Sequence, residues 1–449
     1  MAPPAQTLEA MSASVQKHIA TVWPRTGGIW PGVDFSEHSV ILTDGKAAYV
    51  LDKDGRRPVS VDTLKKRKVA LPTRPGSFNP ITWEGKKSLI LWPRTRNATG
   101  KDKDPTGFEP ADAALNTFGL ATHEEFHPYV QHGGSAPWRS LQQAEKDAGQ
   151  GDRDTVYPVR AEPRIQRAMV YNSLLAAYKE PDRRAQHLAA AAYWQRTWAR
   201  ANPDEAQASR PVELLEGTAK YFEVAAVAMA ETGSADPAKT RAHLRETLQP
   251  MKLASKAFEP YAIGAAALLN ADAMGLGNVK KTLTTTYTTP LDQVLRGIRP
   301  ATSAQAPADV RRGIEDNVRK TNESLSKVID PFVKAMADDS TPMLLIPIDA
   351  TSESVGAEGF YTTEELPVTI IPGFRLTFDK LTSGKLTINR ATVGILDLDG
   401  KGYYALPLSL DGTKNRLDDR RLTLDTPRIS GTVTVTTRTD DGKRSYIAQ

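Results

Sequence analysis

The spacing of hydrophobic residues changes twice along the chain and divides it into three stretches. Residues 1–110 combine helical spacing with strand-like alternation, and the alternating segments flank Asp44-Gly45, a pair typical of hairpin turns. Residues 93–110 are polar and rich in turn-forming residues, which predicts a long loop. The pattern of this first stretch predicts one amphipathic helix and three strands, over residues 5–22, 38–44, 46–52 and 87–92.

The second and third stretches differ in their hydrophobic period. Residues 111–338 are rich in alanine and leucine at helical spacing, so we expect a mainly helical domain. Residues 339–449 alternate with a period of two, in short segments between glycine, aspartate and proline turns, which predicts an all-β domain that is a β-sandwich or barrel-like. The predicted fold class is α+β, with a mixed α/β N-terminal region over residues 1–110.

Composition places few further limits on the chain. At 449 residues, with 40% hydrophobic and 25% charged residues, it is long enough for two to three domains. No apolar run approaches 18 residues, so we expect no membrane span. The net charge is +5, and basic residues are dispersed apart from KKRK at residues 65–68, which we interpret as a solvated face and not as a nucleic-acid-binding patch.

Cysteine is absent, which excludes disulfides, thiolate metal ligands and a cysteine nucleophile. The first ten residues, MAPPAQTLEA, have neither the basic nor the apolar segment of a signal peptide, and they are compatible with the start of a mature chain whose leader was removed. Both features favour an extracytoplasmic location, periplasmic or secreted, and are also compatible with a cytoplasmic one.

The strongest chemical signal is HEEFH at residues 123–127, which fits the pattern H-E-x-x-H. On a helix, side chains at positions i and i+4 project from one face, so His123 and His127 can reach one ion. Neutral imidazole nitrogens suit zinc, and Glu124 can accept a proton from the attacking water. With 7 histidines in the chain, chance gives roughly 0.006 such matches.

Pro128, directly after the motif, supports another interpretation, in which two ordinary histidines stand at a helix end. Proline disfavours the helical conformation of the residue before it and removes one helical hydrogen bond, which costs roughly 3 kcal/mol in a helix interior. Structural zinc sites supply binding free energies on the order of 10 kcal/mol. A kink at His127 is therefore compatible with a metal site, although the helix can also end there.

A site with two histidines needs a third protein ligand and an open fourth position. Val130 and Gly133 stand where the longer H-E-x-x-H-x-x-G-x-x-H pattern requires glycine and histidine, so that pattern is not fulfilled. Glu216 is the best candidate, because it lies in the helical, alanine-rich segment ELLEGTAKYFE and a carboxylate in apolar surroundings needs a partner or a metal. The alternative for Glu216 is a partly exposed helical glutamate.

HEEFH and LLEGTAKYFE together resemble the gluzincin metallopeptidases, whose third zinc ligand is a glutamate on a later helix, often within E-G-x-A. EPYAIGAAALLNADAMG (residues 259–275) is similar to the P-Y-x-x-G helix of the aminopeptidase N-like members, in which the tyrosine hydroxyl stabilises the oxyanion. The resemblance covers residues 111–275 and implies a zincin-like catalytic domain. It implies that His123, His127 and Glu216 are zinc ligands, that Glu124 is the general base, and that Tyr261 is the oxyanion donor. A core tyrosine is the alternative for Tyr261.

The chain departs from the familiar members of this family in three respects. His127 and Glu216 are separated by residues 128–215, or 88 residues, where the best-known families have about twenty. No G-x-M-E-N segment precedes the motif, so the usual contact with a free N-terminal amine is missing. Lys220, four residues after Glu216, offers no acidic partner for a histidine at that position.

The sequence therefore predicts a zinc metallopeptidase that acts on a peptide or protein substrate through a zinc-activated water and a glutamate base. The departures affect the substrate class and exopeptidase activity more than the zinc site. The alternative is a non-catalytic binding or scaffold protein with a structural or degenerate metal site. The oligomeric state is not indicated by the sequence.

Overall fold

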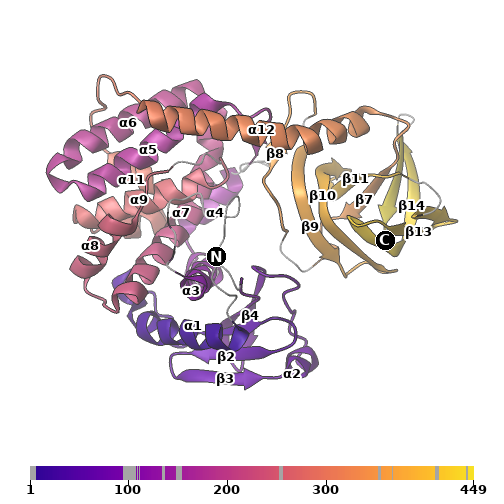
Figure 1. The fold of residues 1–449 in the computed structure, drawn as a ribbon, viewed down its shortest axis with the longest axis horizontal. Helices are drawn as coiled ribbons and strands as arrows, with labels where there is room; N and C mark the ends of the chain where they lie inside the picture. Colours follow the sequence, from indigo (N-terminus) through magenta and orange to yellow (C-terminus); the bar gives the residue numbers. More distant parts are fainter. Residues whose placement is uncertain are drawn as a thin grey trace. The chain divides into compact units, whose positions relative to one another are not determined.

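The computed structural model describes residues 7–94, 108, 110, 112–133, 137–147, 154–251, 256–351, 355–366, 368–409, 414–440 and 443–449. The fold is α+β and divides into two compact units (Figure 1). Unit 1 comprises Met1–Asp152 and Glu162–Ile314, and unit 2 comprises Arg153–Ala161 and Glu315–Gln449. The predicted loop over residues 93–110 lies almost entirely outside the described residues.

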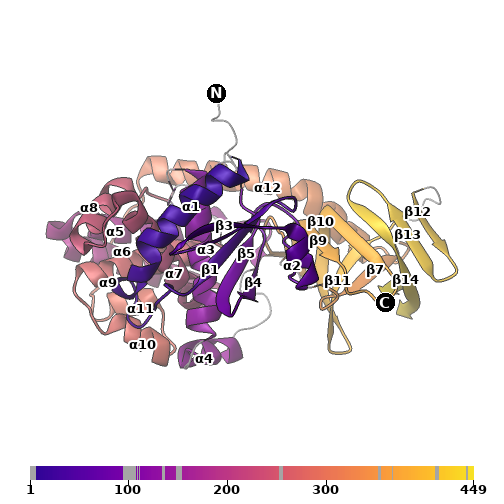
Figure 2. The same ribbon diagram turned by 90° about the horizontal axis from the view of Figure 1, so that it is seen from below.

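Unit 1 opens with helix α1 and a five-stranded sheet of order β3-β2-β1-β5-β4 (Figure 2). Strands β1 and β5 are parallel, and the other neighbours are antiparallel. The elements are α1 (Leu8–Val22), η1 (Trp23–Gly28), β1 (Ser39–Thr43), β2 (Ala48–Asp52), β3 (Gly55–Val59), α2 (Val61–Lys66), β4 (Phe78–Trp83) and β5 (Lys86–Leu91). The predicted N-terminal helix and the predicted hairpin across Asp44-Gly45 are confirmed.

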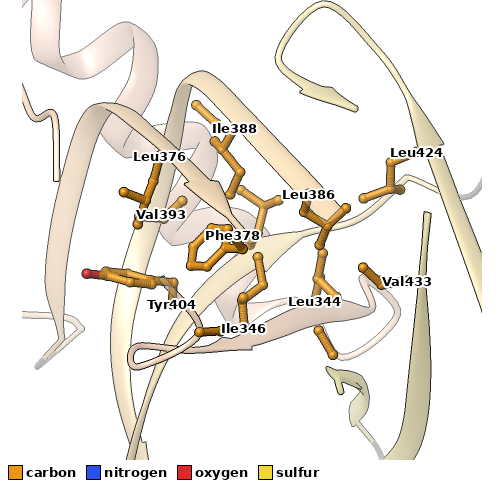
Figure 3. Packing of buried hydrophobic residues seen from close by; sticks show 14 of the residues in the cluster. Leu344, Ile346, Leu376, Phe378, Leu386, Ile388, Val393, Tyr404, Leu424 and Val433 are labelled. Atoms are coloured by element: carbon orange, nitrogen blue, oxygen red, sulfur yellow. The ribbon is translucent and has the colours of Figure 1, made fainter. Parts of the chain in front are cut away.

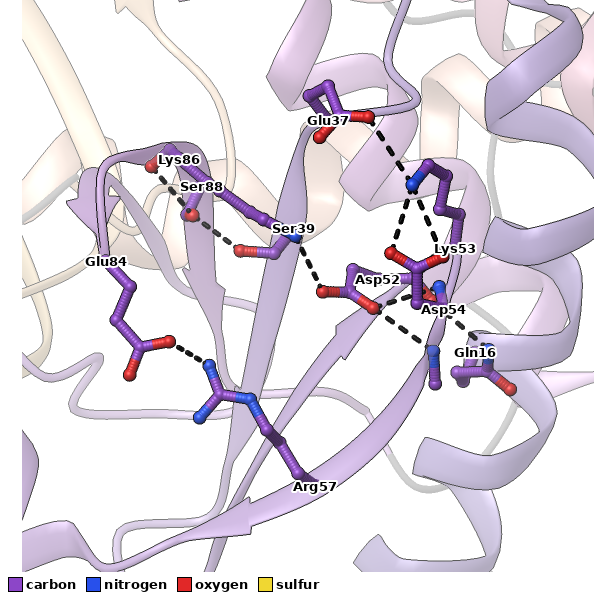
Figure 4. Close-up of polar contacts among 11 residues, drawn as sticks. Gln16, Glu37, Ser39, Asp52, Lys53, Asp54, Arg57, Glu84, Lys86 and Ser88 are labelled. Carbon is purple, nitrogen blue, oxygen red and sulfur yellow. Dashed lines mark hydrogen bonds and ion pairs between the residues drawn. The ribbon is translucent and has the colours of Figure 1, made fainter.

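Polar side chains join α1 to the sheet and the sheet strands to one another (Figure 4). The Gln16 amide donates from α1 to the carbonyl of Asp52 at 3.2 Å, and the Asp52 carboxylate pairs with Lys86 at 3.0 Å. The Ser39 and Ser88 hydroxyls meet at 2.6 Å between β1 and β5. Exposed ion pairs contribute little stability, so the buried apolar faces of α1 and the sheet supply most of the binding between them.

The rest of unit 1 is helical. Its elements, which end in a helix shared with unit 2, are α3 (Ala113–Phe126), η3 (His127–Gln131), α4 (Arg139–Asp147), α5 (Ala161–Lys179), η4 (Pro181–Arg183), α6 (Arg184–Ala201), α7 (Pro203–Thr232), α8 (Pro237–Thr247), α9 (Glu259–Ala273), α10 (Val279–Thr285), α11 (Pro290–Leu295) and α12 (Ala308–Ala337). Most of α7 and α9 is buried: α9 is mainly apolar, whereas α7 also buries the charged residues Glu213, Glu216, Lys220 and Glu223. Helix α7 therefore forms the centre of this unit.

Unit 2 is a β domain. Its strands are β6 (Thr155–Val156), β7 (Met343–Pro347), β8 (Tyr361–Thr362), β9 (Thr369–Phe378), β10 (Lys385–Leu398), β11 (Lys401–Pro407), β12 (Asn415–Asp418), β13 (Arg421–Asp425), β14 (Ile429–Asp440) and β15 (Lys443–Ala448). The first half of β10 pairs with β14 and its second half with β11, so five strands (β10, β11, β7, β15 and β14) close into a ring. The pairing of β10 with β9 shifts register around Arg390, whose φ of 56° marks the bulge that bends β10.

The core of unit 2 is formed by strands of this ring together with β9 and β13. Alternate residues of each strand point inward, as the period of two in the sequence predicts. Figure 3 shows side chains of this core around Phe378, which is fully buried; they come from β7, β9, β10, β11, β13 and β14. The labelled residues are Leu344, Ile346, Leu376, Phe378, Leu386, Ile388, Val393, Tyr404, Leu424 and Val433.

Two expectations about the surface can be compared with the structure. None of the helices in the described part of the chain combines the length and the apolar character that crossing a membrane requires. The basic run at residues 65–68 lies at the end of α2, and all four of its side chains are exposed, as expected for a solvated face.

Candidate metal centre

Helix α3 carries the first half of the motif and lies close against α7. It begins at Asp112, whose side chain accepts a hydrogen bond from the Leu115 amide at 2.8 Å. Gly119 lies one turn before His123, and a Cβ at this glycine would be 3.0 Å from the Val227 side chain on α7. The missing side chain therefore lets the two helices approach closely at the level of the motif.

Pro128 changes the helix type within the motif. Helix α3 ends at Phe126, and residues His127–Gln131 continue as one π-helical turn, η3, in which the His132 amide donates to the His127 carbonyl at 2.9 Å. Proline has no N–H to donate, and a wider turn accommodates its ring without ending the helix. The hydroxyl of Tyr129 accepts a hydrogen bond from the Ser88 amide at 3.2 Å, which ties η3 to strand β5.

The structure brings together His123, His127 and Glu216, which come from two segments of the sequence. The Nε2 atoms of His123 and His127 each lie 3.3 Å from the same oxygen, Oε2 of Glu216. His123 and Glu216 are buried, and His127 is partly buried. Four ligands on a tetrahedral zinc at about 2.0–2.1 Å lie roughly 3.3 Å from one another, so these three residues could hold a metal ion.

The hydrogen-bond partners of both imidazoles turn their Nε2 atoms toward this common point. Nδ1 of His123 lies 3.1 Å from Oε2 of Glu223, and Nδ1 of His127 lies 2.6 Å from Oε1 of Gln131. When each Nδ1 carries a proton and donates it, each Nε2 presents a lone pair. Two lone pairs and a carboxylate oxygen then converge, and a metal ion could bind between them.

Glu223 supplies the acidic partner that the sequence did not reveal. It stands seven residues after Glu216, which is two turns along the same face of α7. Its Oε1 accepts a bond from Lys220 at 2.8 Å while its Oε2 faces His123. As expected, Lys220 is not a hydrogen-bond partner of a histidine. It instead holds in place the Glu223 carboxylate, which is the partner of His123. A search for acidic residues at i+7 as well as i+4 from Glu216 would have found it.

Burial and charge act in opposite directions on the ionisable groups here. Burial lowers the pKa of His123, but hydrogen bonds to Glu216 and Glu223 outweigh it and raise the pKa well above its ordinary value. Burial raises the pKa of Glu223, but Lys220 and His123 more than offset this and lower it. Without a metal, His123 thus holds a proton that a metal ion would displace.

Glu124 and Tyr261 lie beside the three potential ligands. Burial raises the pKa of Glu124, which also senses the charges of His123, His127 and Glu216. A raised pKa suits a general base that must later release its proton. The Tyr261 ring is nearly parallel to that of His123, with centroids 6.1 Å apart and an interplanar angle of 9°.

Two motif glycines set the distance between the helices that carry Glu216 and Tyr261. Gly217 of α7 and Gly264 of α9 meet where the helices cross, and a Cβ on Gly217 would lie 2.8 Å from the Gly264 Cα. No side chain fits in this contact. The sequences E-G-x-A and P-Y-x-x-G therefore share one packing requirement, and each also supplies a polar residue to the site.

Comparisons with protein-family models, curated proteins and solved structures find no match. The chemistry of the site therefore has to be argued from its geometry. Two cavities of about 250 and 90 Å³ lie elsewhere in unit 1, and neither is lined by His123, His127 or Glu216.

Proposed function

We propose that the chain is a zinc-dependent metallopeptidase. The observation that carries this proposal is the convergence of two imidazole nitrogens and one carboxylate oxygen, with both imidazoles oriented by buried partners. Catalytic zinc sites use three protein ligands of this kind and leave one position open for water or substrate. The combination of two nitrogens and one oxygen favours zinc over magnesium or calcium, which prefer oxygen ligands alone.

The residues around the ligands suit hydrolysis of a peptide bond. A bound zinc ion would polarise the scissile carbonyl and make water acidic enough to act as a nucleophile near neutral pH. The Glu124 carboxylate then accepts the proton of the attacking water and delivers it to the nitrogen of the leaving amine. The Tyr261 hydroxyl donates a hydrogen bond to the carbonyl oxygen as negative charge develops there.

The test is Glu124→Gln, which keeps the size of the side chain and removes its basicity. We expect the variant to retain about one zinc per chain and its fold, and to lose at least about 100-fold in turnover on a mixed peptide library, the lower range for a positioned base. Wild-type activity should also disappear with a chelator and return with zinc.

The adjacent residue provides a matched control. Glu125 is fully buried and bonds Nδ1 of His38 at 2.9 Å, away from the three ligands. Glu125→Gln should keep wild-type turnover. Near-normal turnover of Glu124→Gln, or a purified protein that neither contains nor takes up zinc, would contradict the proposed function.

A further inference from the structure

Gln131 connects the two helices that supply the potential ligands. Its side chain is 1% exposed and makes three hydrogen bonds. Oε1 faces Nδ1 of His127 at 2.6 Å, and Nε2 donates to the carbonyl of Leu215 at 2.7 Å and to the Thr218 hydroxyl at 2.8 Å. Leu215 directly precedes Glu216, so one side chain spans the gap between the segments that carry His127 and Glu216.

The orientation of this amide follows from its partners. A backbone carbonyl can only accept, so the amide nitrogen of Gln131 has to face Leu215 and the amide oxygen has to face His127. The Thr218 hydroxyl is free to accept because its own proton goes to the Leu214 carbonyl at 2.8 Å. An amide oxygen also only accepts, so Nδ1 of His127 carries a proton, and Nε2 is the nitrogen left to bind a metal ion.

We propose that Gln131 is a positioning residue for the metal: it fixes the tautomer and direction of the His127 ring and holds that ring at a set distance from Glu216. This inference rests on the metal binding that is part of the proposed function. The π-helical turn contributes, because it places Gln131 beside His127 in a segment that Pro128 prevents from continuing as an α-helix. Neither leucine nor glutamate can make all three contacts, since leucine has no polar atoms and a carboxylate cannot donate to Leu215.

The experiment measures zinc affinity by competition with a chromophoric chelator, on the full-length protein and without any peptide substrate. Gln131→Leu should bind zinc about 10- to 100-fold more weakly, as is typical when an outer-shell partner of a metal ligand is lost. Gln131→Glu keeps an acceptor for His127 but loses the hydrogen bond to Leu215, so its zinc affinity should lie between those of Gln131→Leu and wild type. The absorption spectrum of bound cobalt should change more in Gln131→Leu than in Gln131→Glu.

Gln293 on α11 provides the matched control. It is a buried glutamine whose amide donates to the Thr288 hydroxyl at 2.9 Å, on a helix that carries none of the three potential ligands. Gln293→Leu should lower the metal-free Tm about as much as Gln131→Leu does, and leave zinc affinity unchanged. Wild-type zinc affinity in Gln131→Leu, or an equal loss in Gln293→Leu, would overturn the proposal. A wild-type protein that binds zinc in this manner but cleaves no peptide would overturn the proposed function and leave the role of Gln131 standing.

Discussion

At the scale of single residues, the motif helix α3 carries a second buried polar pair, His38 with Glu125. Burial lowers the pKa of His38 to about 4 and raises the pKa of Glu125 well above its ordinary value. His38 is therefore neutral near pH 7, and its Nδ1 lies 2.9 Å from Oε2 of Glu125. The contact between His38 and Glu125 therefore joins the segment just before β1 to helix α3.

His38 makes stability depend on pH in the acidic range. An unfolded histidine binds a proton below about pH 6.5, whereas folded His38 does so only near pH 4. The unfolded state therefore gains protons first as pH falls, and about 3 kcal/mol of stability is lost across this window. In His38→Gln, with a chelator present so that metal release does not contribute, the fall in Tm between pH 7 and pH 5 should be smaller than in wild type. Parallel pH profiles of Tm would contradict this assignment.

The sequence identified some site residues and missed others for physical reasons. His123, His127 and Glu216 stood out because ligand chemistry restricts residue type and spacing along a helix. Gln131 was missed because Pro128 left open whether the helix continues past His127, and only a continued helical turn brings position i+4 beside His127. Glu223 was overlooked because the second partner of a histidine can come from any residue on the facing helix, and only the packing of α3 on α7 selects it.

At the scale of helices and strands, the crossing of α7 and α9 is the contact on which the site geometry depends most. A methyl group on Gly217 would meet the Gly264 Cα at 2.8 Å and the Pro260 carbonyl oxygen at 3.1 Å, and all of these are backbone atoms that cannot rotate away. The helices would have to separate, and Glu216 and Tyr261 would move with them.

Gly217→Ala should therefore destabilise the protein by about 1–3 kcal/mol, the usual cost of overpacking, and weaken zinc binding. Gly313→Ala is the control, because Gly313 lies exposed within α12 and a Cβ there meets nothing within 4 Å. That substitution should raise stability by up to about 1 kcal/mol through helix propensity alone. Denaturant unfolding of the two variants measures the difference, and a stabilised Gly217→Ala would show that the helices can absorb the extra methyl group.

Local sequence signals predicted most of the helices and strands, but two strands that contain proline were not predicted. The turn at Asp399-Gly400 is one of the glycine and aspartate turns between the alternating segments, and it joins β10 to β11 through a two-residue loop with both φ angles positive. Strands β3 and β4 were not predicted, because Pro58 and Pro80 lie inside them and proline ordinarily argues against a strand. Both strands lie at the edges of their sheet, where a missing N–H is tolerated.

At the scale of the whole molecule, the change from helices to strands falls where the sequence predicts it, but the compact units divide elsewhere. Helix α12 ends at Ala337 and β7 begins at Met343, whereas the division between the units lies within α12. Unit 2 also contains β6, which comes from residues before α5 and pairs in parallel with β8. This pairing joins segments about 200 residues apart in sequence, so a local hydrophobic pattern cannot predict it.

The distribution of tryptophan allows the two units to be followed separately. All 7 tryptophans of the chain belong to unit 1, namely Trp23, Trp30, Trp83, Trp92, Trp138, Trp194 and Trp198. The cluster that contains Ile41 lies within unit 1, and the clusters that contain Phe378, Phe332 and Met343 lie within unit 2. Tryptophan fluorescence therefore reports the unfolding of unit 1, and far-UV circular dichroism reports both units.

Removal of the metal should therefore lower the stability of one unit and not of the other. A ligand that binds only the folded state stabilises it by about 2.7 kcal/mol at 100 times its Kd, and all three potential ligands belong to unit 1. A chelator should lower the Tm followed by tryptophan fluorescence, and added zinc should restore it. Circular dichroism also follows unit 2, which fluorescence does not detect, and the midpoint temperature of that part of the transition should not change. An unchanged fluorescence Tm would argue against metal binding in unit 1, and equal shifts by both probes would show that the two units unfold together.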